Sequence, residues 1–326
     1  MQFDAERRED PRHEVAPAAR SDAKALAMLV ERLSIEVSPK EVLHSGHALG
    51  VPAGTRTFIT RLPRGSFEDT RAAAVALRQA GLQPVPHVAV RTVPDAGTLE
   101  RWLRFFVRDA GVEEILLIAG SQERPLGAFG ETADTLASGV IEGSGLRAVS
   151  FAGHPEGHPV ADADELQRAI DVKNEFAART GLSCALVTQF FFDATPVIAW
   201  ERRLRERGNR LPIDPGLHGV TGVPSLLKHA LACGIGASVK ALSAHGSGGI
   251  LQFAQIRTPD ALAQALAAAL ANDPDSLFRG FHLFPLGGLA KTVDWMAQVQ
   301  RSAAGTSLAE GVPGAGAEDG IARPPQ

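Results

Sequence analysis

The sequence predicts an α/β fold in which eight parallel strands close into a single (β/α)8 barrel. Short apolar runs alternate with helical patterns along the chain, which indicates repeated βα units and a parallel sheet. Eight such runs can be counted, as this barrel requires. A chain of 326 residues, 44% of them hydrophobic, can bury a core of this size in one domain.

Each predicted strand is a short apolar run, as is typical of strands that are covered on both faces. The eight runs, in chain order, are Leu33–Val37, Thr57–Arg61, Pro84–Val90, Glu114–Ala119, Arg147–Ala152, Cys184–Phe190, Pro212–Leu217 and Gly280–Phe284. The sheet is therefore expected to lie inside a shell of helices.

Helices between the strands are indicated by apolar stripes with a period of 3.6 residues. One stripe contains Leu99, Trp102, Leu103, Phe106 and Val107, and another contains Leu166, Ala169, Ile170 and Ala177. Lys173 falls on the inward stripe of the second helix, where a lysine either extends its amine to solvent or meets an anion. Thr258-Pro259-Asp260 predicts a helix start with Thr258 as the capping hydroxyl.

The composition of the two ends of the chain predicts a tail on each side of one domain. Residues 1–24 are rich in charge and residues 302–326 in small and acidic residues, so both are expected to be disordered around a barrel at 25–301. The glycine-rich segment Gly234–Gln255 is interpreted as a long connection, because no Gly-Lys-Ser/Thr sequence completes a phosphate loop.

Composition limits the class of protein. The net charge of −4 gives no basic footprint for nucleic acid or an anionic membrane. No apolar run reaches the ~20 residues that cross a bilayer, and the first 20 residues lack an apolar signal core. Cys184 and Cys233 show no metal-ligand spacing and no disulfide framework. A cytoplasmic protein is expected, and a homo-oligomer is left open.

Polar or titratable residues recur at one end of the predicted strands. They are Glu36, Thr60, His87, Ser121, His154, His158, Gln189, His218 and His282. Chemistry in such barrels takes place at the C-terminal ends of the strands, so this recurrence favours a polar pocket there. Polar capping of the barrel rim is the alternative.

Glu36 is the most specific of these residues, because it interrupts the apolar run Leu33–Val37. Loss of water around a carboxylate raises its pKa, and we expect this for Glu36. A raised pKa would suit a general acid near neutral pH. The alternative is a salt bridge to an arginine or lysine at the rim.

Two strand-end segments carry a family resemblance. Ala185–Asp193 runs from an apolar strand into Gln189, three phenylalanines and Asp193, a set that can bind and stack on a flat polar heterocycle. His154-Pro155-Glu156-Gly157-His158-Pro159 follows the preceding strand, and its prolines make a helical zinc pair the weaker interpretation. Each segment alone could be ordinary strand-end packing. Together they resemble the methylenetetrahydrofolate reductase family, flavin-dependent barrels that reduce a folate-bound methylene to methyl.

The resemblance covers Leu33 to Met296 and implies a role for each site residue. Glu36, followed by Pro39, would be the acid that protonates the folate nitrogen. The substrate residues would be Gln189, Ser121 and Phe284, and the residues at the flavin (FAD) would be Thr60, His87, Gly120, Ser121, Ala152, His154, His158 and Lys173. The implied reaction converts 5,10-methylenetetrahydrofolate to 5-methyltetrahydrofolate, with NADH or NADPH as reductant.

Several positions depart from the family pattern. Ala119-Gly120-Ser121 stands where the family often has Arg-Gly-Asp, Gly222-Val223 where it has Asn-Phe, and Phe284–Gly288 where it has Tyr-Thr-Leu-Asn-Arg. These changes keep two alternatives open. One is a folate oxidoreductase that uses no flavin, and the other is a non-catalytic folate-binding paralogue.

Overall fold

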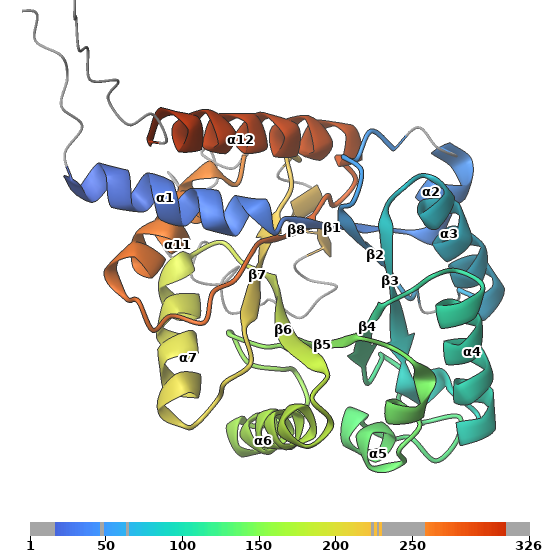
Figure 1. The fold of residues 1–326 in the computed structure, drawn as a ribbon. Helices are drawn as coiled ribbons and strands as arrows, with labels where there is room; N and C mark the ends of the chain where they lie inside the picture. The colour runs from blue at the N-terminus through green and yellow to red at the C-terminus, as the bar shows by residue number, and fades with distance from the viewer. Residues whose placement is uncertain are drawn as a thin grey trace, which may run out of the picture.

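The eight strands form a closed barrel in the order in which they occur along the chain (Figure 1). The structure is a computed structural model that describes residues 17–45, 49–62, 65–222, 225–226, 228–229 and 258–310, with backbone alone at 17–20 and 305–310. Neighbouring strands are parallel, including the pair of the last strand with the first. The predicted (β/α)8 barrel is confirmed.

The strands coincide closely with the predicted apolar runs. They are β1 (Ser34–Val37), β2 (Arg56–Ile59), β3 (Gln83–Ala89), β4 (Glu114–Ile118), β5 (Ala148–Gly153), β6 (Ser183–Phe190), β7 (Ile213–His218) and β8 (His282–Phe284). No boundary differs from the prediction by more than two residues, because the length of each apolar run follows the length of strand that the helices cover.

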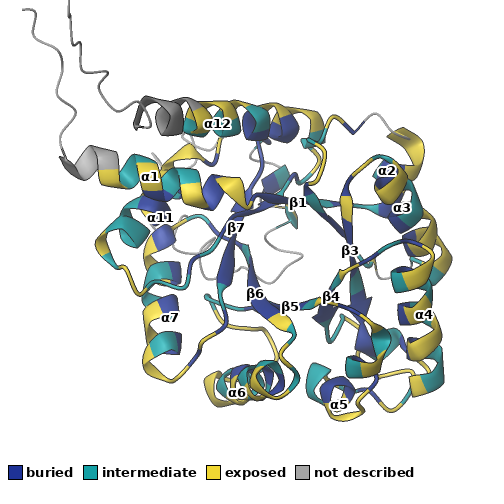
Figure 2. Ribbon diagram, in the orientation of Figure 1, coloured by how far each residue is buried: buried dark blue, intermediate teal, exposed yellow. Residues whose placement is uncertain are grey.

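The described helices surround the barrel. They are α1 (Pro17–Glu31), α2 (Pro39–Ser45), α3 (Phe67–Gln79), α4 (Ala96–Arg108), α5 (Thr132–Ala137), α6 (Ala163–Thr180), α7 (Ala194–Glu206), α11 (Asp260–Asn272) and α12 (Leu289–Glu310), with 3-10 turns η1 (Val90–Thr92) and η2 (Glu142–Ser144). Their buried sides face the strands and their exposed sides face outward (Figure 2). In α4, for example, Leu99, Leu103 and Phe106 are buried, as the predicted stripe requires.

Two sequence expectations about helix ends are corrected. α11 begins at Asp260 with Pro259 as its N-cap and no side-chain capping bond, so Thr258 is not the cap. α1 begins at Pro17, inside the predicted N-terminal tail, and α12 continues to Glu310, beyond the predicted barrel boundary. α1 is amphipathic: Ala25, Leu29 and Val30 are buried, and the helix packs on α11 and α12. The predicted loop Gly234–Gln255 lies outside the described residues.

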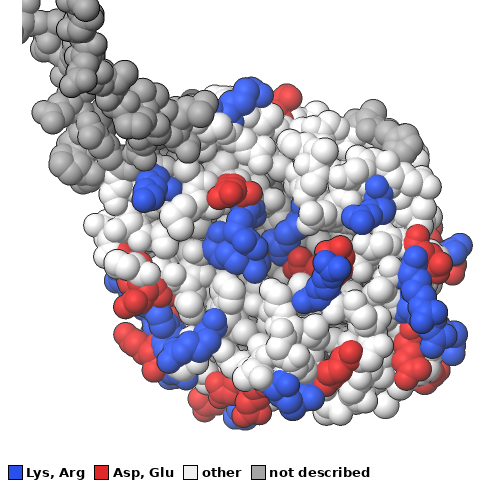
Figure 3. Space-filling model, viewed as in Figure 1, with Lys and Arg blue, Asp and Glu red and all other residues white. Residues whose placement is uncertain are grey.

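A network of charged side chains fills the N-terminal end of the barrel. Arg56 binds Glu114 through two nitrogens at 2.7 and 2.8 Å and Asp214 at 3.1 Å. Arg279 donates two hydrogen bonds to the fully buried Asp214, and Ser150 donates one to Glu114 at 2.6 Å. Figure 3 shows basic side chains gathered at the centre of this face beside acidic ones. The two guanidinium charges are thus balanced by two carboxylates.

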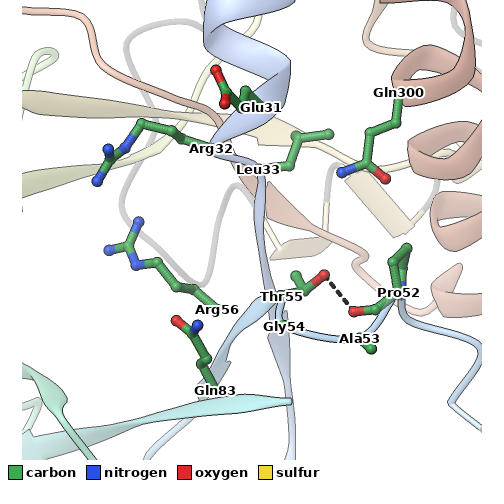
Figure 4. A pocket seen from close by; sticks show the side chains of 10 residues that line it. All are labelled: Glu31, Arg32, Leu33, Pro52, Ala53, Gly54, Thr55, Arg56, Gln83 and Gln300. Carbon is green, nitrogen blue, oxygen red and sulfur yellow. Dashed lines mark hydrogen bonds between the residues drawn. The ribbon is translucent and has the colours of Figure 1, made fainter. Parts of the chain in front are cut away.

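A cavity of about 240 Å³ opens at this same N-terminal end, away from the site described below. Figure 4 shows Arg32, Arg56, Gln83 and Gln300 at its edges. Above the charged network, the barrel interior is filled by an apolar layer of Phe58, Val85, Leu116 and Val187. This layer separates the charged network from the side chains at the C-terminal ends of the strands, where the chemistry of such barrels takes place.

Candidate active site

A carboxylate between two imidazoles lies at the C-terminal end of the barrel. Glu36 Oε2 is 3.5 Å from His87 Nε2 and 3.5 Å from His282 Nε2. The side chain of Glu36 is 18% exposed, that of His87 9%, and that of His282 is fully buried. The ring of Phe58 lies beneath the group, with its centre 4.5 Å from that of His282. Glu36 is therefore the member of the group most open to a ligand.

The expected direction of the pKa shift of Glu36 is wrong. Burial raises the pKa of this carboxyl, as the sequence suggested, but the hydrogen bond to His282 and the charges of His87 and His282 outweigh burial and lower it. Burial lowers the pKa of His87 to about 4, against the opposing effect of Glu36. Without a ligand, Glu36 is accordingly an anion at neutral pH. The alternative of an arginine or lysine partner is also wrong, because the partners are histidines.

Gln189 lies at an irregularity of the sheet. The register between β6 and β7 shifts between Val187 and Phe190. Thr188 Oγ1 donates to the Gln189 carbonyl at 2.8 Å and accepts from the Gly216 amide at 2.8 Å, which holds the bulge. A Cβ at position 216 would lie 2.5 Å from the Thr188 carbonyl, so β7 needs glycine there. Bulges of this kind re-aim side chains beside active sites, and this one sets the direction of the half-buried Gln189.

Aromatic rings form one wall of the same end of the barrel. The ring centre of Phe284 is 4.6 Å from that of His282 and 5.8 Å from that of Phe190. Phe192 lies 5.9 Å from Phe190 and 6.3 Å from His218, also between ring centres. The aromatic surface predicted beside Gln189 thus extends to Phe284, one of the predicted substrate residues, and adjoins the histidine–carboxylate group.

A second cluster of titratable residues follows β5. The imidazoles of His154 and His158 are 5.0 Å apart and perpendicular, in a loop that begins directly after Gly153. Burial, with the charges of His158 and Lys173, lowers the pKa of His154 to about 4. His158 is exposed, and burial of its ring together with Arg91 lowers its pKa. Among the described residues, no group of three or more potential ligands could hold a metal ion.

Lys173 is buried in α6, as predicted, with 6% of its surface exposed. Its Nζ lies 3.5 Å from the carbonyl of Ala152 and 5.5 Å from the centre of the Phe151 ring. Burial lowers its pKa to about 8, and no carboxylate in the described part of the chain pairs with it. This cation therefore points at the end of β5 without a neutralising charge.

Gly120, Ser121 and Thr60 complete the predicted set. Gly120 adopts a φ of +92°, and a Cβ there would lie 3.0 Å from that of Ala89, so the loop after β4 runs close to β3. Ser121 is exposed in this loop, which Arg91 fastens by donating to the carbonyls of Gln122 and Gly130. Thr60 follows β2, and its buried Oγ1 has no hydrogen-bond partner.

Sequence reasoning gave no role to Ser34 or Phe58 and no partner to His282. Ser34 Oγ lies 2.9 Å from His282 Nδ1, and the two residues are register partners of β1 and β8. The signal was present, since Ser34 precedes Glu36 by two residues and so faces the same side of the strand. Closure of the barrel was needed to bring strand eight beside strand one.

The fold and the site define an α/β barrel protein with an acid–histidine group at the C-terminal end of its strands. Residues 59–273, more than half of the chain, match the model of the methylenetetrahydrofolate reductase family. The chain belongs to this family, which confirms the resemblance read from its sequence.

Similar proteins are distant or matched over a short segment. Methylenetetrahydrofolate reductase 1 of Schizosaccharomyces pombe is 32% identical over 88 residues, which are 27% of this chain and 14% of that protein. A Toxoplasma gondii ME49 structure provisionally assigned as a deoxyribose-phosphate aldolase is 12% identical, with a TM-score of 0.43 over 86% of this chain and 98% of its own. Oxaloacetate acetylhydrolase is 13% identical, with a TM-score of 0.40 over 86% and 85%.

A search of the described helices for a membrane span finds none with the necessary length and hydropathy.

Proposed function

We propose that this protein reduces 5,10-methylenetetrahydrofolate to 5-methyltetrahydrofolate with the help of a flavin. The observation that carries the proposal is the carboxylate of Glu36, held between two histidines at the ligand-facing end of a barrel of this family. Reduction of the methylene requires that one carbon–nitrogen bond of the folate ring opens, which needs a proton on a weakly basic nitrogen. Glu36 is the acid placed to give that proton.

Gln189 and the aromatic rings serve the folate. A carboxamide can both donate to and accept from the amide and amine edge of a pterin, and the bonds of Thr188 fix the backbone of Gln189 at the bulge. Phe284 offers a ring face between His282 and Phe190. An offset stack on such a face supplies ~0.5–1.5 kcal/mol beyond the burial of area.

The predicted flavin residues between β2 and α6 fit a flavin dinucleotide. Lys173 is a buried cation without a carboxylate partner in the described structure, as an anionic phosphate would require. The unpartnered Oγ1 of Thr60 and the imidazoles of His87, His154 and His158 offer further polar contacts. When bound, the flavin would accept hydride from reduced nicotinamide and pass it to the folate methylene.

A folate oxidoreductase without flavin is the second candidate. The observation that favours it is the loop after β4, where neutral residues at 119 and 121 stand in place of an arginine and an acid. Ala119 and Ser121 are neutral, so they give no charge to a flavin phosphate or ring. Reduced nicotinamide would in that case pass hydride directly to the folate.

Absorbance of the purified protein in the flavin bands distinguishes the two candidates. If flavin is present, Glu36→Gln separates the half-reactions in rapid-mixing kinetics, because the amide keeps the shape of the acid but has no acidic proton to transfer. Bleaching by reduced nicotinamide should stay near normal, and reoxidation by methylenetetrahydrofolate should slow by at least about a hundredfold, within the 10²–10⁴ that a positioned acid supplies.

Equal slowing of both half-reactions would show that Glu36 has a structural role. Normal reoxidation would exclude Glu36 as the acid, and no turnover with any nicotinamide would favour a non-catalytic folate-binding protein.

A further inference from the structure

The acid group extends inward through a buried histidine to a buried serine. His282 is fully buried between Glu36 and Ser34: its Nε2 is 3.5 Å from Glu36 Oε2, and its Nδ1 is 2.9 Å from Ser34 Oγ. Ser34 is also fully buried, and its Oγ lies 3.3 Å from the carbonyl oxygen of Phe281. The chain of contacts thus ends at a backbone acceptor.

The contacts of Ser34 allow two arrangements of the hydrogens. Either Ser34 donates to His282 Nδ1 at 2.9 Å, or it donates to the Phe281 carbonyl at 3.3 Å and accepts from Nδ1. In the second arrangement Nδ1 carries the one hydrogen of a neutral imidazole. Nε2 is then left with a lone pair that faces the carboxylate of Glu36.

Two lone pairs that face each other in a buried place repel unless a proton lies between them. We propose that Ser34 fixes His282 in this tautomer, so that Glu36 and His282 hold one shared proton, and that this proton is the one given to the folate nitrogen. The inference rests on the proposed function and adds two positioning residues, His282 and Ser34, to the acid.

The proton is accounted for at each step. Before the reaction it is shared between His282 Nε2 and Glu36 Oε2, which are 3.5 Å apart. As folate excludes water from Glu36, the proton moves to Oε2 and from there to the ring nitrogen. The bond from the methylene carbon to that nitrogen then breaks and its electrons stay on the nitrogen, while the other ring nitrogen shares its lone pair with the carbon to form an iminium ion.

His87 is the remaining titratable group that acts on Glu36. It approaches the same Oε2 atom at 3.5 Å, and no contact links it to Ser34 among the described residues. Burial lowers the pKa of His87 to about 4, so it is neutral near pH 7 and can act as a hydrogen-bond donor to Glu36 without storing a proton. This difference singles out His282 as the store.

The direct test is nitrogen NMR of the full-length protein labelled with ¹⁵N-histidine, as purified. The His282 signals are assigned by their loss in His282→Gln. We expect Nδ1 of His282 to carry a hydrogen in the wild-type protein. In Ser34→Ala this preference for Nδ1–H should be lost. A bare Nδ1 in the wild-type protein would overturn the proposal whether or not the protein reduces folate.

Kinetics supply the second test. Ser34→Ala should slow reoxidation by methylenetetrahydrofolate on the order of tenfold, a part of the 10²–10⁴ that the positioned acid supplies, and should shift the pH profile of that half-reaction. Ser34→Thr, which keeps the hydroxyl, should restore the profile. The matched control is Ser150→Ala, an equally buried serine that binds Glu114 at the other end of the barrel. A profile that Ser34→Ala leaves unchanged, or that Ser150→Ala shifts equally, would refute a role for Ser34 in the proton store.

Discussion

Lys173 should make the folded protein less stable than a neutral residue would. Its ammonium group is buried in α6 with a carbonyl at 3.5 Å and no carboxylate partner among the described residues. Substitution by methionine, which is unbranched and similar in length, removes the charge and keeps the packing. We therefore expect Lys173→Met to raise the free energy of unfolding.

The size of this effect follows from the pKa. Burial lowers the pKa of Lys173 from 10.5 to about 8, which corresponds to about 3 kcal/mol of lost stability at pH 7. The Phe151 ring, 5.5 Å away, returns ~0.5–2 kcal/mol of this as a cation–π interaction. The net gain for Lys173→Met is then about 1–3 kcal/mol.

The gain should also depend on pH. Below pH 8 the lysine is charged in both the folded and the unfolded chain, so the cost is present in full. Between 8 and 10.5 the folded protein loses the proton first, so wild-type stability rises with pH relative to the variant and the difference fades.

Urea unfolding at pH 7 and pH 10 measures the stability gain of Lys173→Met and its dependence on pH. Lys24→Met, an exposed lysine of α1, is the control and should change stability by less than about 0.5 kcal/mol. A Lys173→Met protein that is no more stable than wild type at pH 7 would refute the reasoning that the charge is unpaired. Flavin retention in the same variant should fall if Lys173 holds a phosphate.

Two further predictions concern the fold. Asp214→Asn should cost about 3–5 kcal/mol in urea unfolding, because it removes the fully buried carboxylate that pairs with the half-buried Arg56 and Arg279. Burial raises the pKa of Asp214, but the bonds and charges of Arg279 and Arg56 outweigh it and lower that pKa, so the contribution should be full above pH ~4 and fade below it; a constant difference down to acid pH would contradict this. Leu29→Ala should cost about 2–5 kcal/mol because Leu29 is fully buried where α1 packs on α11 and α12, and a loss below 0.5 kcal/mol in the melting or urea curve would show that α1 adds little.

The positions of the strands could be predicted from the sequence, because each strand is an apolar run as long as the segment that the surrounding helices cover. The sequence was also sufficient to single out Glu36 and Lys173, since a charge within an apolar pattern is visible without a structure. It was not sufficient for the sign of the pKa shift of Glu36, which depends on His87 and His282 rather than on burial alone. The N-terminal boundary was missed because the buried residues Ala25, Leu29 and Val30 lie in the second half of α1, whereas most of its polar residues lie in the first half.

The acid group is assembled from the two ends of the fold. Ser34 and His282 are 248 positions apart, and β8 pairs with β1 over two register partners, Ser34 with His282 and Ile35 with Leu283. Lys173 and Ala152, by contrast, are 21 positions apart within one βα unit.

Local opening of a structure begins where few pairs hold it. Partial separation of β8 from β1 would pull His282 away from Glu36 while the β5–α6 unit stayed intact. Under mild heat or denaturant, the contacts of Glu36 with His282 should therefore be lost before Lys173 and Ala152 lose their arrangement, and under the proposed function proton delivery would fail first.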